Sequence, residues 1–183
     1  MWGYMHHNRT AHAAMDRRGP NSIVQGTSSD MAYIGGRCLQ KMIWKRYHSK
    51  GKDFSLKQNN AVHDSSEMMC KIKDLPESLY LVEHALTTAV HLDCEKVYDW
   101  KLNIGLEIEI EIGFTLGDMK KWDFTEHGLK NILESQIPFA EKELKHKFKK
   151  KTIDKLWKKW GSVKIRRRKE LQQVDVIERT DIL

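Results

Sequence analysis

The chain has 183 residues, 40% of them hydrophobic and 31% charged, and its formal net charge at pH 7 is +7. This length and composition suit one modest folded domain with some irregular sequence, and they exclude fibrous and collagen-like classes of protein. No run of about 18 uncharged apolar residues is present, so we expect no transmembrane segment.

The cysteines and the first residues of the chain indicate a compartment. Cys38, Cys70 and Cys94 are odd in number and widely spaced, which argues against a disulfide scaffold. Residues 1–20 are rich in His and Arg and lack an apolar block of signal-peptide length. We therefore expect a reducing, intracellular environment.

Charge is segregated along the chain. Residues 1–66 carry ten Lys and Arg against four acidic residues, and residues 67–141 carry seven against fifteen. The segment 142–169, called the basic block below, carries fourteen against two, and residues 170–183 carry one against four. Such segregation bears on partners rather than on fold. The basic block needs a counter-charge, which a nucleic acid, an anionic membrane or the acidic part of the chain itself could supply.

Residues 1–64 predict a basic, largely irregular N-terminal arm, because their polar and apolar residues follow neither a period of 2 nor one of 3.6. The segment 37–47 is an exception, since Leu39, Met42 and Ile43 can share one face of a short helix or of a segment that folds on binding. Residues 65–183 predict the folded domain.

That domain is expected to begin with a helix at about 76–91, followed by the clearest pattern in the chain. From Trp100 to Leu116 every even position is apolar and every odd position is polar or glycine. Strict alternation predicts one long amphipathic β-strand with one face in a core, bent at Gly105 and Gly113. Its polar face carries three glutamates, Glu107, Glu109 and Glu111.

Two helices are expected after the strand. Asp123 or Thr125 is placed to cap the first, which would end near Gln136. Pro138 fits the first turn of the second, and Gly161 fits its C-terminal stop.

Residues 162–177 return to strand character. The order of elements predicts an α+β fold with a mostly antiparallel sheet, in which the long strand is packed by helices.

The second of these helices is the leading functional candidate, because an apolar stripe runs beside many lysines. Lysines neutralise phosphates, whereas tryptophans form a core, stack on bases or lie at a bilayer interface. A solvated helix whose lysines serve solubility is the plain alternative. The predicted nucleic-acid or anionic-surface binding residues are Lys145, Lys149, Lys150, Lys151, Lys155, Trp157, Lys158, Lys159, Arg166, Arg167 and Arg168.

The arginine run has two other interpretations. The clusters 147–151 and 164–169 have the spacing of a bipartite nuclear-localisation signal. On a strand, however, Lys164, Arg166 and Arg168 would share one face and could pair with the glutamate row of the long strand.

Signals for an enzyme are weak. His84, His91 and Cys94, with Asp93 or Cys70, could hold zinc, but no Cys-x-x-Cys or His-Glu-x-x-His motif accompanies them. The glutamate row could bind a divalent metal in a nuclease, although such a row more often marks the polar face of a sheet. We predict no catalytic residue, no cofactor and no resident metal.

Together these patterns predict a non-enzymatic assembly protein that binds RNA or DNA through its phosphates, with homo-oligomers as one option. An ordering contact from the arm would add to the basic block, through Arg17, Arg18, Lys41, Lys45 and Arg46. The alternative is a peripheral membrane or viral matrix-type structural protein that uses the same helix on anionic lipid. A metal-dependent nuclease comes third. The expected location is intracellular, in the cytoplasm and, through the bipartite signal, the nucleus.

Overall fold

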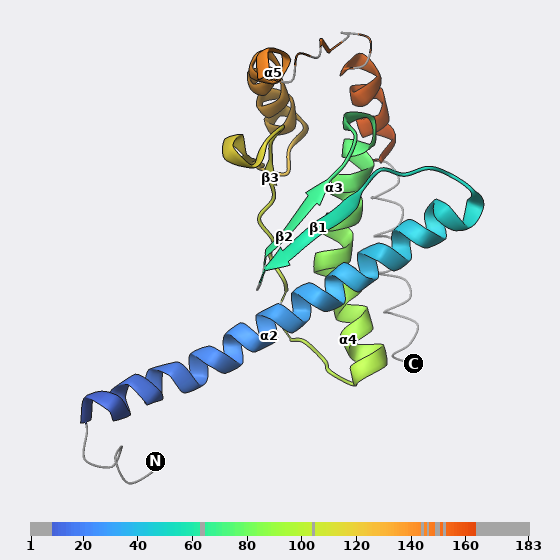
Figure 1. Cartoon of the computed structure of the whole chain (residues 1–183). Coiled ribbons are helices and arrows are strands. Elements are labelled where there is room, and N and C mark those ends of the chain that lie inside the picture. The colour runs from blue at the N-terminus through green and yellow to red at the C-terminus, as the bar shows by residue number, and fades with distance from the viewer. Residues whose placement is uncertain are drawn as a thin grey trace. The chain divides into compact units, whose positions relative to one another are not determined.

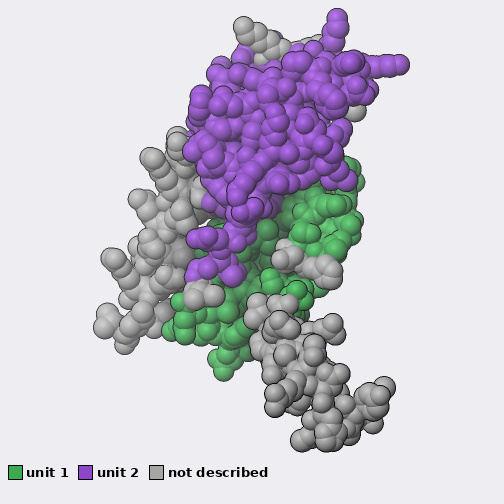
Figure 2. Space-filling model, turned by 90° about the vertical axis from the view of Figure 1, so that its left-hand side faces the viewer, with its two compact units in different colours: residues 1–69, 84–104 green, residues 70–83, 105–183 purple. Residues whose placement is uncertain are grey.

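The computed structural model (Figure 1) describes residues 9–62, 65–103, 105–143, 145, 147–148, 151 and 153–163, and of residues 9–24 it describes the backbone alone. The described part of the chain has an α+β fold, as the sequence predicts, with two small antiparallel sheets. It divides into two compact units (Figure 2). Unit 1 is Met1–Met69 with His84–Ile104, and unit 2 is Cys70–Glu83 with Gly105–Leu183.

Unit 1 begins with the long helix α2 (Arg9–Arg46). The short helix expected at 37–47 is the C-terminal part of α2, which begins at Arg9, where the sequence indicated irregular chain. Helix propensity alone does not predict this extension, because the segment contains poor helix formers: Gly19, Pro20 and the Gly, Ser and Thr residues of 26–29. The division into an arm of residues 1–64 and a domain of residues 65–183 stays a prediction.

A β-hairpin follows α2 in unit 1. Its strands are β1 (Lys57–Val62) and β2 (Ser65–Met69), which pair antiparallel with Lys57 opposite Met69. Gly51 precedes the hairpin at a φ of 65°, a left-handed conformation that glycine adopts without strain.

The π-helical turn Ala85–Ala89 and α4 (Val90–Tyr98) complete unit 1, and α2 packs against both. The approach is close at Gly35, where an added Cβ would lie 2.4 Å from Leu86 Cδ2. The apolar core of this unit is made of Met31, Cys38, Leu39, Ile43, Phe54, Leu56, Ala85, Val90 and Cys94.

The helix expected at about 76–91 is present, and it extends beyond the predicted end. Helical residues run without a break from α3 (Leu75–His84) through the π-helical turn to the end of α4 at Tyr98. Asp99 then takes a left-handed conformation and ends the helix.

The long strand predicted at 100–116 differs from the structure, which has a short β-ladder in this region of unit 2. Among the described residues of 100–116, only β3 (Glu111–Ile112) pairs in a ladder, with β4 (Lys120–Lys121), although the Trp122 N–H also donates to the Ile110 carbonyl over 2.8 Å. The predicted faces are nevertheless present, because the even residues from Leu106 to Ile112 are half-buried or buried and the odd ones are exposed. The ladder is short because its partner strand has two residues.

Helix α5 (Glu126–Glu143) is capped by Thr125, one of the two candidates, Asp123 and Thr125, that the sequence offers. Thr125 Oγ1 accepts the Gly128 N–H over 2.9 Å, and Asp123 Oδ1 accepts the Thr125 N–H and O–H. The hydroxyl of Thr125 and then its N–H lower the pKa of the Asp123 carboxyl. The cap therefore fixes the start of α5 at Glu126, close to Trp122 in the core.

Two expected helix boundaries are corrected. Pro138 lies inside α5 rather than in the first turn of a new helix, where it lacks the N–H that would bond to the Glu134 carbonyl and its ring crowds that carbonyl. Gly161 does not end a helix, because the described helical residues run from 153 to 163.

The core of unit 2 is built around Trp122, which is 1% exposed. The Trp160 ring meets it edge-on at 5.6 Å between centroids, and the Trp122 Nε1–H donates to the Thr125 carbonyl over 2.8 Å. Gln136, also buried, donates from Nε2 to the carbonyls of Ile112 and Asp118 and so joins α5 to the β3–β4 hairpin. The other buried members of this core are Leu79, Ile112, Leu129, Ile132, Leu133 and Leu156.

Candidate polyanion-binding surface

One side of the helical residues described at 151 and 153–163 is buried, with Leu156 and Trp160 in the core of unit 2. Leu156, Trp160 and Val163, spaced by four and three residues, are 2%, 9% and 4% exposed. Lysines with the same spacing occupy the opposite side of the helix and are exposed. These three residues, Lys151, Lys155 and Lys158, are called the lysine face below.

The charges of the lysine face are not compensated within the described part of the chain. None of its three ammonium groups has an ion pair or a hydrogen bond with a described residue. Asp154 is the one acidic residue in the described positions from 151 to 163. Lys145 and Lys147, just before the helix, are exposed as well. This side of unit 2 can therefore offer several cations to a polyanion.

Two of the residues predicted to bind also make contacts within the fold of unit 2. Lys159 Nζ lies 3.3 Å from Oδ1 of the buried Asp74 and donates to the Lys73 carbonyl over 2.9 Å. Trp157 is half-buried and packs against the core of unit 2, so its ring is not a free stacking surface. The sequence alone could not separate Lys159 from the lysine face, because its partner Asp74 is 85 positions away in the chain.

The remaining predicted residues, Lys149, Lys150, Arg166, Arg167 and Arg168, lie outside the described residues. The bipartite localisation signal and the arginine–glutamate pairing extend into the same positions and stay predictions. Among described residues, the glutamate row receives its cation from β4, because Lys121 Nζ lies 2.5 Å from Glu109 Oε1.

The candidate metal ligands are not brought together. No group of three or more His, Cys, Asp or Glu in the described ranges is placed to hold a metal ion. Cys94 is fully buried, its thiol contacts Met31 Sδ at 3.7 Å, and burial raises the thiol pKa. Glu107, Glu109 and Glu111 all project to solvent.

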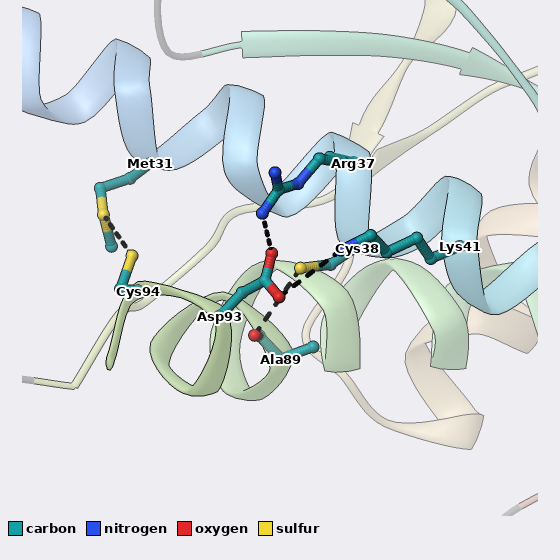
Figure 3. Close-up of polar contacts among 7 residues, drawn as sticks. All are labelled: Met31, Arg37, Cys38, Lys41, Ala89, Asp93 and Cys94. Carbon is teal, nitrogen blue, oxygen red and sulfur yellow. Dashed lines mark hydrogen bonds and ion pairs between the residues drawn. The ribbon is translucent and has the colours of Figure 1, made fainter. Parts of the chain in front are cut away.

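Several cationic side chains also lie on α2 in unit 1, and Figure 3 shows two of them, Arg37 and Lys41, beside Asp93 of α4. Of the arm residues predicted to contact a polyanion, Lys41 and Lys45 are exposed and Arg46 is half-buried, whereas nothing is described of the side chains of Arg17 and Arg18. Asp93 of α4 accepts a short hydrogen bond from Arg37, and Lys41 Nζ lies 3.7 Å from its other oxygen.

Asp93 also joins α4 to α2 in a pH-dependent way. Partial burial by itself would raise its pKa, but the hydrogen bond from Arg37 and the charges of Arg37 and Lys41 outweigh burial and hold the pKa below its ordinary value. A carboxyl with a lowered folded-state pKa stabilises the fold above its unfolded pKa, about 4, and loses that contribution as the pH falls through the folded value.

We therefore expect Asp93→Asn to be less stable than the wild type at pH 7, with the difference closing as the pH falls below about 4. Urea unfolding followed by circular dichroism at pH 7, 4 and 2.5 measures this. Glu95→Gln, which removes an exposed carboxylate from the same helix, is the control and should leave the stability almost unchanged at each pH. A constant difference between Asp93→Asn and the wild type would contradict the assignment.

Neighbouring Cys38 is a structural residue. Its thiol donates to the Ala89 carbonyl at 3.7 Å, and burial raises its pKa to about 11. At neutral pH the thiol is therefore protonated and unreactive.

Two observations bear on the class of the protein. No helix in the described ranges is both long enough and apolar enough to cross a membrane. Three exposed cations without a partner among the described residues share the lysine face, opposite a buried apolar stripe. No protein-family model, no curated protein and no solved structure matches this chain.

Proposed function

We propose that the protein binds nucleic acid, RNA or DNA, through the phosphate backbone and without sequence preference, and that it serves assembly rather than catalysis. The supporting observation is the lysine face. Leu156 and Trp160 hold the opposite side of the helix in the core, so three cations are presented together without the cost of ordering a flexible segment.

The same geometry favours nucleic acid over a membrane surface. An amphipathic helix on a bilayer inserts its apolar side among the lipids. In the helix of residues 153–163 that side is covered by the core of unit 2, which leaves only the charges for an outside partner. The proposal includes an intracellular location in the cytoplasm, which rests on the odd number and wide spacing of the cysteines, and in the nucleus, which rests on the basic clusters of the sequence.

The test replaces the lysine face with Lys151→Gln, Lys155→Gln and Lys158→Gln in one variant of the full chain. Each phosphate contact contributes about 0.9 to the slope of log K against log salt on duplex DNA and about 0.7 on single strands. We expect the slope to decrease by about 3 for duplex DNA and about 2 for single strands, with weaker binding at low salt. Fluorescence anisotropy on labelled oligonucleotides measures both.

A matched variant removes three other lysines of unit 2, Lys120, Lys121 and Lys130. This variant has the same net charge as the lysine-face variant, because each loses three lysines. Its three lysines already contact Ser135, Glu109 and Glu134 within the fold, so it should keep the wild-type slope. Equal losses in both variants would reduce the effect to net charge and contradict the proposal. Binding to anionic liposomes alone, or a strong preference for one base sequence, would contradict it as well.

A further inference from the structure

The exposed side of α2 in unit 1 carries large aromatic rings among cations. Trp44 is 64% exposed and Tyr33 is 61% exposed, which is unusual for rings of this size. With intervals of four, four and three residues, four of these side chains form one line along α2, and His48, in the short 3-10 helix His48–Lys50 that follows, continues the line through its ring contact with Trp44. We call this line the aromatic stripe: Tyr33, Arg37, Lys41, Trp44 and His48.

A hollow lies at the Tyr33 end of the stripe. It has a volume of about 560 Å³ and is lined by Asp30, Tyr33 and Ile34 of α2 with Tyr98 and Trp100. The left-handed turn at Asp99 brings Trp100 back toward α4, where its N–H donates to the Cys94 carbonyl over 3.1 Å. The hollow therefore has aromatic walls, one of them set by a defined turn.

Arg37 connects the hollow to the rest of the stripe. Its guanidinium lies 5.6 Å from the centre of the Tyr98 ring, and it also donates to Asp93. At the other end of the stripe, the centroids of the Trp44 and His48 rings lie 6.2 Å apart. Tyr33 and Trp44 are eleven residues apart, or roughly 16 Å along the helix axis.

Aromatic rings interleaved with cations have the chemistry that binds single-stranded nucleic acid. Unpaired bases stack on such rings whatever their sequence, whereas the faces of bases in a duplex are already covered by their neighbours. The carboxylate of Asp30 can accept a hydrogen bond from the exocyclic amine of a base. The negative charges of Asp30 and Asp93 offset Arg37 and Lys41, so stacking would contribute more here than phosphate contacts.

We infer that the aromatic stripe and its hollow bind the unpaired bases of single-stranded RNA or DNA. This inference rests on the proposed function and sharpens it, because it names the kind of nucleic acid. The two surfaces act differently. The lysine face contributes a salt-dependent contact to single and double strands alike, and the stripe contributes a contact that depends little on salt and applies to single strands.

The experiment compares Trp44→Ala and Trp100→Ala with the wild type, each as the full chain. Binding to a labelled single-stranded 12-mer of uridine and to a duplex of equal length is measured at 50 and 200 mM salt. We expect each alanine variant to bind the single strand about tenfold more weakly at both salt concentrations, with the slope unchanged. Duplex binding should stay within twofold of wild type.

Two further variants serve as controls. Trp44→Phe keeps an aromatic ring and should retain most of the single-strand affinity. Phe139→Ala removes an exposed ring of α5 in unit 2 and should change neither affinity. Circular dichroism and thermal unfolding establish that each variant is folded.

The outcomes separate the two proposals. If the lysine-face variant loses its salt slope while the tryptophan variants bind single strands like the wild type, the inference is overturned and the proposed function stands. If only the tryptophan variants lose affinity for single strands, the inference stands and the lysine face is not the contact. Equal losses on single strands and duplex in the tryptophan variants overturn the inference, and absence of wild-type binding overturns both.

Discussion

Replacing Trp122 with alanine is expected to lower the free energy of unfolding of unit 2 by about 3–5 kcal/mol. The side chain is 1% exposed and packs at the centre of the unit 2 core, with the Trp160 ring edge-on at 5.6 Å. The substitution removes this contact area and leaves a cavity that the β3–β4 hairpin and α5 cannot fill. It also leaves the Thr125 carbonyl without the indole donor at the start of α5.

Trp122→Phe is the graded comparison, since it keeps most of the apolar contacts and loses the indole N–H. Its decrease in the free energy of unfolding should be less than half of that caused by Trp122→Ala. Phe139→Ala, an exposed ring on α5, should change the stability by about 0.5 kcal/mol or less. Urea unfolding followed by circular dichroism gives these differences, and a loss below about 1 kcal/mol for Trp122→Ala would show that the ring is not a core residue.

Leu39→Ala is expected to be the corresponding large loss in unit 1, about 2–5 kcal/mol. Leu39 is 2% exposed and belongs to the side of α2 that packs on the π-helical turn and α4. Because the aromatic stripe occupies the other side of the same helix, packing at Leu39 also decides whether the stripe is held in one arrangement.

Its neighbour Gln40 provides the matched control, because it is exposed on the same turn of α2. Gln40→Ala should leave the stability within about 0.5 kcal/mol of wild type. The same urea titration serves both variants. Similar small effects at the two positions would mean that α2 does not pack in unit 1 as described.

Local rules predicted the elements that local sequence determines. The continuous helix through Val90, the cap at Thr125 and the alternate burial from Leu106 to Ile112 all follow from spacing over a few residues. The extent of the long strand did not follow, because a ladder needs a partner and β4 offers only two residues. The β1–β2 hairpin was missed since the strand residues of β1 are mostly polar.

The candidate surfaces show the same limit. The sequence identified the lysines of the basic block, but it could not assign Lys159 to Asp74, because that ion pair joins two distant parts of the chain. It also left Trp44 out of the predicted contacts, although its spacing from Lys41 and Tyr33 was a readable signal. Exposure, the property that makes Trp44 interesting, is decided by which face of α2 packs on α4.

Each compact unit is built from two separate stretches of the chain, and this affects how the protein can be dissected. A fragment that starts at Ser65 would keep β2 without β1 and α4 without α2, so Val90 and Cys94 would lose their covering helix. Such a fragment would expose apolar surface and bind many partners indiscriminately. Deletion mapping and limited proteolysis would then report misfolding as function, and single substitutions in the intact chain avoid that error.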